Sequence, residues 1–188
     1  MTMTVRERAD TIGTMRYLSV YAMETLARWV PTTADLEAKI LFGRHIWEFA
    51  QHADHLGKRT HELRAALHHS PAPTPAYEAA LELLRGTEGA TERIAAFHDV
   101  FIPDLQAKYA AFLGATDHFL DEPSVRVVER IGPDLDRMRM DARETRAERP
   151  AMTASGAPTE ARLAAALAAA SPWVRHRAAA ATVAESLA

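Results

Sequence analysis

Apolar residues recur along most of the chain with the three- to four-residue spacing of amphipathic helices. The pattern predicts five helices, which cover roughly residues 9–30, 33–68, 74–86, 91–120 and 125–140. A proline cannot continue the helical hydrogen bonding, so Pro103 should kink or split the fourth helix, and Gly132–Pro133 should break or bend the fifth. Strand-like alternation is absent. The pattern therefore predicts an all-α fold.

The character of the chain changes after Met140. Residues 142–159 are polar, contain Pro and Gly, and are typical of a linker, whereas residues 160–170 and 172–187 are Ala-rich and favour helix. Alanine offers little area to bury, so this tail could pack on the bundle, pair with another chain or fray. We expect a bundle over residues 1–141, a linker over 142–159 and C-terminal helices over 160–188.

The second predicted helix carries an unusually wide apolar arc. Its members are Leu36, Ile40, Phe42, Ile46, Trp47, Phe49, Ala50, Ala53 and Leu56. A helix that is apolar over so much of its surface should lie in the centre of the bundle. His45 and His52 fall inside one edge of the arc, and Glu48 lies between them at the border, one helical turn from each.

Histidines are concentrated in the same helix, because six of the nine lie between His45 and His69. His45 and His52 are either hydrogen-bonded core residues or members of a site. Glu48 either pairs with Arg44 on the surface or acts as a metal ligand or proton acceptor. His98 lies in the apolar stripe of the fourth helix and has the same two interpretations, since a buried imidazole must find a partner.

Composition narrows the function further. The chain has 188 residues, of which 48% are hydrophobic, and a net charge of −3 with a pI near 6.3, which argues against a nucleic-acid partner. Without cysteine, any metal would need His, Asp and Glu ligands. No apolar run is long enough to cross a membrane, and the N-terminus lacks the apolar core of a signal peptide, so we expect a soluble, cytoplasmic protein.

Two stretches resemble a group of bacterial ferritin-like proteins. Residues 36–56, which contain the block Arg-His-Ile-Trp-Glu at 44–48, are similar to the second bundle helix of that group. Residues 102–126, which run from Ile-Pro-Asp-Leu to Asp-Glu-Pro-Ser-Val-Arg, resemble its later helices. The likeness covers most of the chain from Tyr17 to Ile131. It implies a ferritin-like up-and-down helical bundle in which carboxylates and histidines from four helices hold two metals.

Carried over by residue, the resemblance implies metal ligands at Glu24, Glu48, His52 and Asp121, with iron or manganese as the cofactor. Periodicity alone makes Glu24 a surface residue that pairs with Arg28, and the resemblance would turn it inward. Asp121 could also serve only as a helix cap. The chain departs from the family pattern because His52, not a glutamate, precedes His55 by three residues. A two-metal site of this kind needs about six protein ligands, and the resemblance does not provide that many in this sequence.

Two functional hypotheses follow. In the first, the protein is a metal-dependent oxidoreductase that acts on a small molecule inside the bundle. In the second, the bundle binds no metal and works as an enzyme or as a subunit of a hetero-complex in specialised metabolism. Its acid–base residues would then be His45, Glu48, His52 and His98. The C-terminal helices would be the contact surface of a homo-oligomer or hetero-complex.

Overall fold

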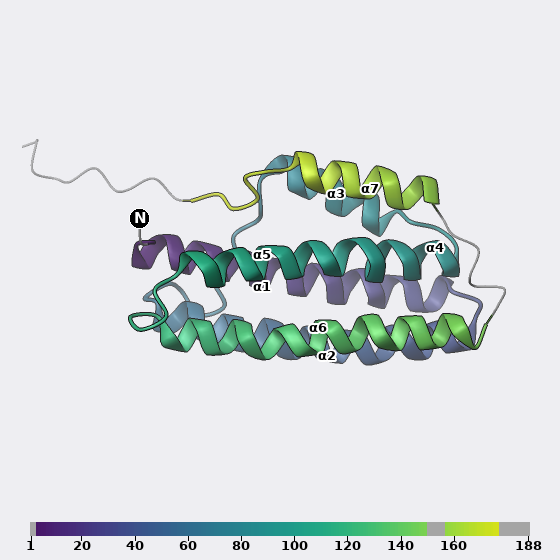
Figure 1. Ribbon diagram of the computed structural model, residues 1–188, viewed down its shortest axis with the longest axis horizontal. Helices are drawn as coiled ribbons and strands as arrows, with labels where there is room; N and C mark the ends of the chain where they lie inside the picture. Colours follow the sequence, from purple (N-terminus) through teal and green to yellow (C-terminus); the bar gives the residue numbers. More distant parts are fainter. Residues whose placement is uncertain (1–2, 150–156, 177–188) are drawn as a thin grey trace, which may run out of the picture.

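Four long helical segments lie side by side (Figure 1). We describe residues 3–149 and 157–176 of the computed structural model. The segments are α1 (Val5–Trp29), α2 (Leu36–Glu62), a continuous run of α4 (Ala90–Ala95), the π-helix η2 (Ala96–Phe101) and α5 (Ile102–Ala115), and α6 (Glu122–Ala147). The shorter helices α3 (Pro75–Arg85) and α7 (Ala157–Ala169) pack against each other beside this group. The described residues are helical or irregular, which confirms the all-α prediction.

The helices form two antiparallel pairs (Figure 1). The short 3-10 turn η1 (Val30–Thr32) reverses the chain between α1 and α2, and the loop after α5 reverses it into α6. The connection between the pairs is longer, because it passes through α3 and returns the chain to the opposite end of the molecule (Figure 1). The helices α5 and α2 therefore run in the same direction, and each pair alone is up-and-down.

Local sequence signals account for most helix ends. Thr4 and Glu7 form a reciprocal capping box at the start of α1, and the Asp35 side chain accepts a hydrogen bond from the Ala38 backbone N–H at 2.9 Å. Pro75 occupies the first turn of α3, which ends at Gly86 as expected. The predicted starts of α2 and α3 agree closely with the observed ones, whereas α1 begins at Val5, four residues before the predicted start.

The second helix ends earlier than predicted, at Glu62 rather than near His68. Arg64 and His68 have φ values of 61° and 57°, in the left-handed region that a helix cannot contain. Its position also differs from the prediction. Leu36, Ile40 and Trp47 are 64%, 43% and 66% exposed, so the wide apolar arc consists of a buried stripe and a second stripe on the surface. The inference that this helix is central was wrong.

The prolines do not end the helices in which they lie. The π-helix η2 ends two residues before Pro103, and the helical segment continues into α5, so the predicted split is absent. A proline lacks an N–H and its ring crowds the preceding turn, and a wider turn relieves that crowding. Pro133 lies inside α6, which runs without a break to Ala147. The first part of the expected linker is therefore helical.

The Ala-rich extension packs on the bundle in the described range. Leu163, Leu167 and Ala170 are at most 4% exposed and belong to the same apolar core as the bundle helices. Of the alternatives open for this tail, packing is confirmed for α7. Residues 172–176 are not helical, and the rest of the predicted second segment lies outside the described residues. Among the described helices, none has the length and apolar character needed to span a bilayer.

Candidate functional site between helices α2 and α6

Two buried histidines meet where α2 faces the π-helix. His45 is 1% exposed and His98 is fully buried, and the Nδ1 atom of His45 lies 2.9 Å from the Nε2 atom of His98. The Nδ1 atom of His98 lies 2.8 Å from the backbone oxygen of Ile94. Both histidines were predicted as members of a site or of the core, and the structure brings them into direct contact.

The hydrogen bonds define which nitrogen of each ring carries a proton. A carbonyl oxygen can only accept, so the Nδ1–H of His98 must donate to Ile94. The Nε2 atom of neutral His98 is then an acceptor, and the Nδ1–H of His45 donates to it. The remaining nitrogen of His45, Nε2, is left with a free lone pair. It has no hydrogen-bond partner among the described residues.

The His45 side chain borders a cavity of about 350 Å³ between α2 and α6. The walls are formed by Arg44, His45, Trp47, Glu48, Arg137, Met138 and Asp141. A second hollow of about 210 Å³ continues along the same two helices, and Arg44 and Asp141 line both. The Oδ2 atom of Asp141 lies 3.6 Å from Nε2 of His45, and the Asp141 side chain is 26% exposed. The buried imidazole therefore meets a cavity that opens to solvent.

Burial keeps both imidazoles neutral at physiological pH. Removal from water lowers the pKa of His45 to about 4, and the guanidinium groups of Arg44 and Arg137 act in the same direction. Oδ2 of Asp141, 3.6 Å from Nε2 of His45, is too far away for a strong hydrogen bond. Burial, followed by the neighbouring His45, lowers the pKa of His98 to about 3. The unprotonated form of His45, which has the free lone pair, is thus the one present near neutrality.

A second polar cluster lies next to the cavity, one to two turns along α2. Nε2 of His52 lies 3.0 Å from Oδ2 of Asp134, and Glu48 completes a group of three possible metal ligands. Glu48 pairs with Arg137. The surface interpretation of the sequence had predicted a pair with Arg44 instead. Burial lowers the pKa of His52, while the hydrogen bond to Asp134 opposes this shift.

Arg137 places a positive charge within this group. A single nitrogen, Nη2, lies 2.8 Å from Oε1 of Glu48 and 2.9 Å from Oδ1 of Asp134. A guanidinium between two carboxylates supplies the charge that a metal ion would otherwise supply. The three donors also come from only two helices, whereas a two-metal site in such a bundle takes about six ligands from four. The described residues do not fit the di-metal set.

Glu24 lies outside the site. Its side chain is 60% exposed and lies 3.9 Å from Arg85 of α3, so it is on the surface as periodicity predicted, although its partner is not Arg28. The inward orientation that the family resemblance implied was wrong. A carboxylate on that surface cannot share a metal with His52, which is 1% exposed in the interface between α2 and α6.

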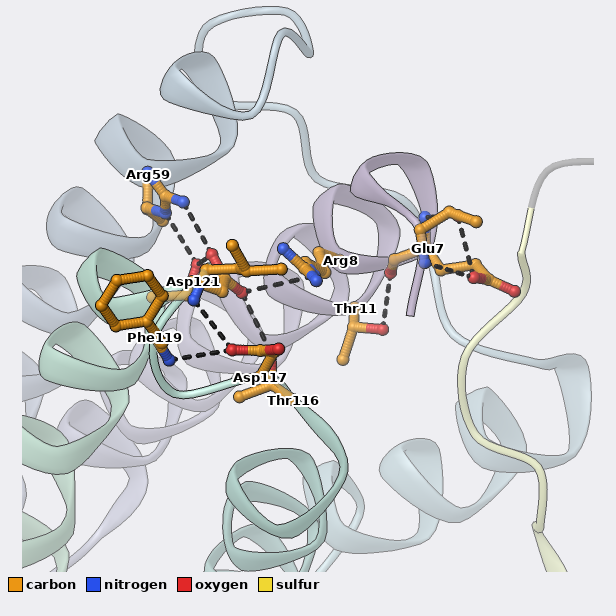
Figure 2. A network of polar contacts seen from close by, with 11 residues as sticks. Glu7, Arg8, Thr11, Arg59, Thr116, Asp117, Phe119 and Asp121 are labelled. Atoms are coloured by element: carbon orange, nitrogen blue, oxygen red, sulfur yellow. Dashed lines mark hydrogen bonds and ion pairs between the residues drawn. The ribbon is translucent and has the colours of Figure 1, made fainter. Parts of the chain in front are cut away.

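Asp121 is buried but belongs to a different network, at the end of the bundle (Figure 2). Its Oδ1 atom accepts hydrogen bonds from Arg59 at 2.8 Å and Ser124 at 2.7 Å. Its Oδ2 atom accepts one from Thr116 at 3.2 Å, and Nε of Arg8 lies 3.7 Å away. Asp134 lies thirteen positions further along the chain, on α6, which corresponds to about 20 Å. Asp121 therefore links α1, α2 and α6 and is not a ligand of the cluster around His52.

The sequence interpretation missed Asp134, Arg137 and Asp141. All three lie on α6 and follow one another at spacings of three and four residues, which puts them on one face of the helix. Their partners on α2 are more than 80 residues away in sequence. The spacing alone could have indicated a polar face, but only the packing of α6 against α2 identifies what that face meets.

Comparison of the chain with models of protein families, with curated proteins and with solved structures gave no match in any of the three. The candidate site is therefore argued from its geometry alone.

Proposed function

We propose that the protein is a ferritin-like bundle enzyme that acts on a small molecule without a metal and uses His45 as a general base. The observation that supports this proposal most strongly is a buried, neutral imidazole with a free lone pair at the wall of a cavity of about 350 Å³. Cavities of this size suit small organic ligands. Two antiparallel helix pairs joined by one long crossover also agree with the ferritin-like arrangement.

The proton transfer follows from the hydrogen bonds. Nε2 of His45 takes a proton from a substrate O–H or N–H while that atom forms its new bond, because a base with a pKa of about 4 needs a proton that becomes acidic during the reaction. The resulting imidazolium keeps its Nδ1–H on His98 and gains the carboxylate of Asp141 as a counter-charge. His98 orients the His45 ring and is a positioning residue.

The first experiment asks whether a ligand and His45 act together. A library of small organic molecules is screened against the isotope-labelled protein for shifts of the His45 ring signals, and each binder is followed for chemical conversion or for exchange of a proton with deuterated water. We expect His45→Gln to abolish turnover and His55→Gln, an exposed histidine on the same helix, to retain it. Equal turnover in the two variants would disprove the proposal.

A measurement on the unmodified chain guards against misfolding of the variant. Diethyl pyrocarbonate acylates accessible neutral imidazoles, and mass spectrometry locates the product. We expect acylation of His45, whose ring lines the cavity and whose Nε2 has no hydrogen-bond partner among the described residues, and protection of His98, whose two nitrogens are both engaged. A bound ligand should slow the reaction at His45. Acylation of His98 ahead of His45 would contradict the geometry.

A second candidate function is a single-metal site at Glu48, His52 and Asp134, favoured by the mutual proximity of their ligand atoms. It would require Arg137 to swing away from both carboxylates. Elemental analysis of protein purified without chelators separates the candidates. Our first proposal expects no stoichiometric iron or manganese. Stoichiometric metal that is lost in His52→Ala would establish the second candidate instead.

A further inference from the structure

The wall of the cavity contains two hydrogen-bond acceptors that face each other. Nε2 of neutral His45 and Oδ2 of Asp141 are 3.6 Å apart, and neither can donate to the other. A ligand with two donor groups can satisfy both at once, with one group at each acceptor. An ammonium group has three donors and a positive charge, which also complements the carboxylate.

The charge around the cavity favours a cation. The two adjoining hollows are lined by five carboxylates and two guanidinium groups. Arg137 pairs with Glu48 and Asp134, and Arg149 pairs with Glu37, so these charges compensate one another. The lining carboxylates that remain are Asp141, Glu144 and Glu148, against the single guanidinium of Arg44. Glu144 and Glu148 line the outer hollow, and neither has an ion-pair partner within the described ranges. An anionic ligand would be repelled by this lining, whereas a cation would be attracted.

The remaining wall is apolar and aromatic. Trp47 borders the inner hollow with 66% of its surface exposed, and Ile40 borders the outer one. An indole face attracts a cation and also packs against a short hydrocarbon chain. These residues provide a surface for the body of a ligand whose charged end lies at Asp141.

We propose that the cavity binds a primary aliphatic amine in its ammonium form, whose N–H groups donate to the carboxylate of Asp141, so that Nε2 of His45 stays free to accept the proton of the ligand's reacting O–H group. This inference rests on the proposed function, since it names the substrate class of the same site. Arg44 lies at the junction of the two hollows and opposes the bound cation. Its guanidinium therefore limits the affinity for an amine.

The test measures binding of n-butylammonium to the whole chain by calorimetry, with n-butanol and butyrate as probes of similar size. We expect only the ammonium ion to bind, with an affinity that falls as salt is added. Asp141→Asn should weaken binding about tenfold, and Arg44→Gln should strengthen it. Asp136→Asn changes an exposed carboxylate of α6 that lines neither hollow and serves as the matched control.

Any of three results would overturn the inference. The first is an equal affinity of Asp141→Asn and Asp136→Asn for butylammonium, and the second is weaker binding of butylammonium to Arg44→Gln. The third is binding of butyrate in place of butylammonium. The two proposals fail separately. Amine binding without turnover dependent on His45 would reject the catalytic role and retain the ligand class. Turnover dependent on His45 with a ligand other than an amine would reject the ligand class alone.

Discussion

The buried carboxylate of Asp121 gives the sharpest stability prediction. Asp121→Asn keeps the shape of the side chain and removes its charge, which leaves the guanidinium groups of Arg8 and Arg59 facing a neutral amide. Both arginine side chains are at most 10% exposed, so water cannot replace the lost partner well. Removing one member of a buried ion pair costs about 3–5 kcal/mol.

The structure places the expected cost at the lower end of that range. Arg59 keeps hydrogen bonds to Glu62 and to Ser124 after the substitution. We therefore expect the free energy of unfolding to fall by about 3 kcal/mol, measured by urea denaturation with the slope of the transition unchanged. The control is Glu122→Gln, which alters an exposed pair with Arg126 and should change stability by less than about 0.5 kcal/mol.

The result also tests the role of Asp121. A loss below about 1 kcal/mol would refute the interpretation of this network as a structural connection between three helices, since a buried ion pair broken at one partner costs more than that. A metal content that changed while stability did not would return Asp121 to the role of ligand that the family resemblance implied.

Two further predictions concern pH and the C-terminal helix. The pKa of His45 is about 4 in the folded chain, below the value of about 6.5 expected when unfolded, so the unfolded chain binds more protons between these values. His45 should therefore contribute about 3 kcal/mol to a fall in the free energy of unfolding as the pH drops from about 6.5 to about 4, measured by denaturation at each pH, and His98, whose pKa is about 3, adds to that fall. His45→Gln should make the dependence on pH shallower, whereas an unchanged slope would contradict the shift. Leu163 is 2% exposed in the common core, so Leu163→Ala should lower the free energy of unfolding by about 2–4 kcal/mol in the same assay. Leu36 is 64% exposed, and Leu36→Ala should lower it by less than about 0.5 kcal/mol. A similarly small effect of both substitutions would mean that α7 adds little to the stability of the fold.

The sequence predicted what depends on neighbouring residues. The helix from Pro75 to Arg85 follows from a proline in its first turn and a glycine after its last residue, and the structure agrees. The end of α2 could not be found in this way, because its left-handed residues are Arg64 and His68 and not the glycine that normally marks a helix end.

The candidate site was predictable only in part. His45, Glu48, His52 and His98 were identified from their density and helical spacing, and they do lie together along α2 and η2. The contact between His45 and His98 joins positions 53 residues apart, and the π-helix changes the angular phase of the fourth segment, so periodicity could not give it.

The predicted metal ligands Asp121 and Glu24 were misplaced because their contacts with other helices cannot be read from neighbouring residues. A helix cap was a sufficient account of Asp121 from the local sequence, and its actual partners Arg8 and Arg59 come from two other helices. For Glu24, periodicity gave the correct exposed surface and the family resemblance gave the wrong one. Local pattern was the better guide for Glu24, whereas neither the local pattern nor the resemblance gave the partners of the buried Asp121.

The central claim is that neutral His45 presents a free Nε2 lone pair to the cavity, and nitrogen-15 NMR of the imidazole rings tests it most directly. Two-bond proton–nitrogen correlations distinguish a ring protonated on Nδ1 from one protonated on Nε2 and from the doubly protonated cation. At pH 7 we predict that His45 and His98 both carry their single proton on Nδ1. A proton on Nε2 of His45, or a charged His45 ring at that pH, would contradict the account.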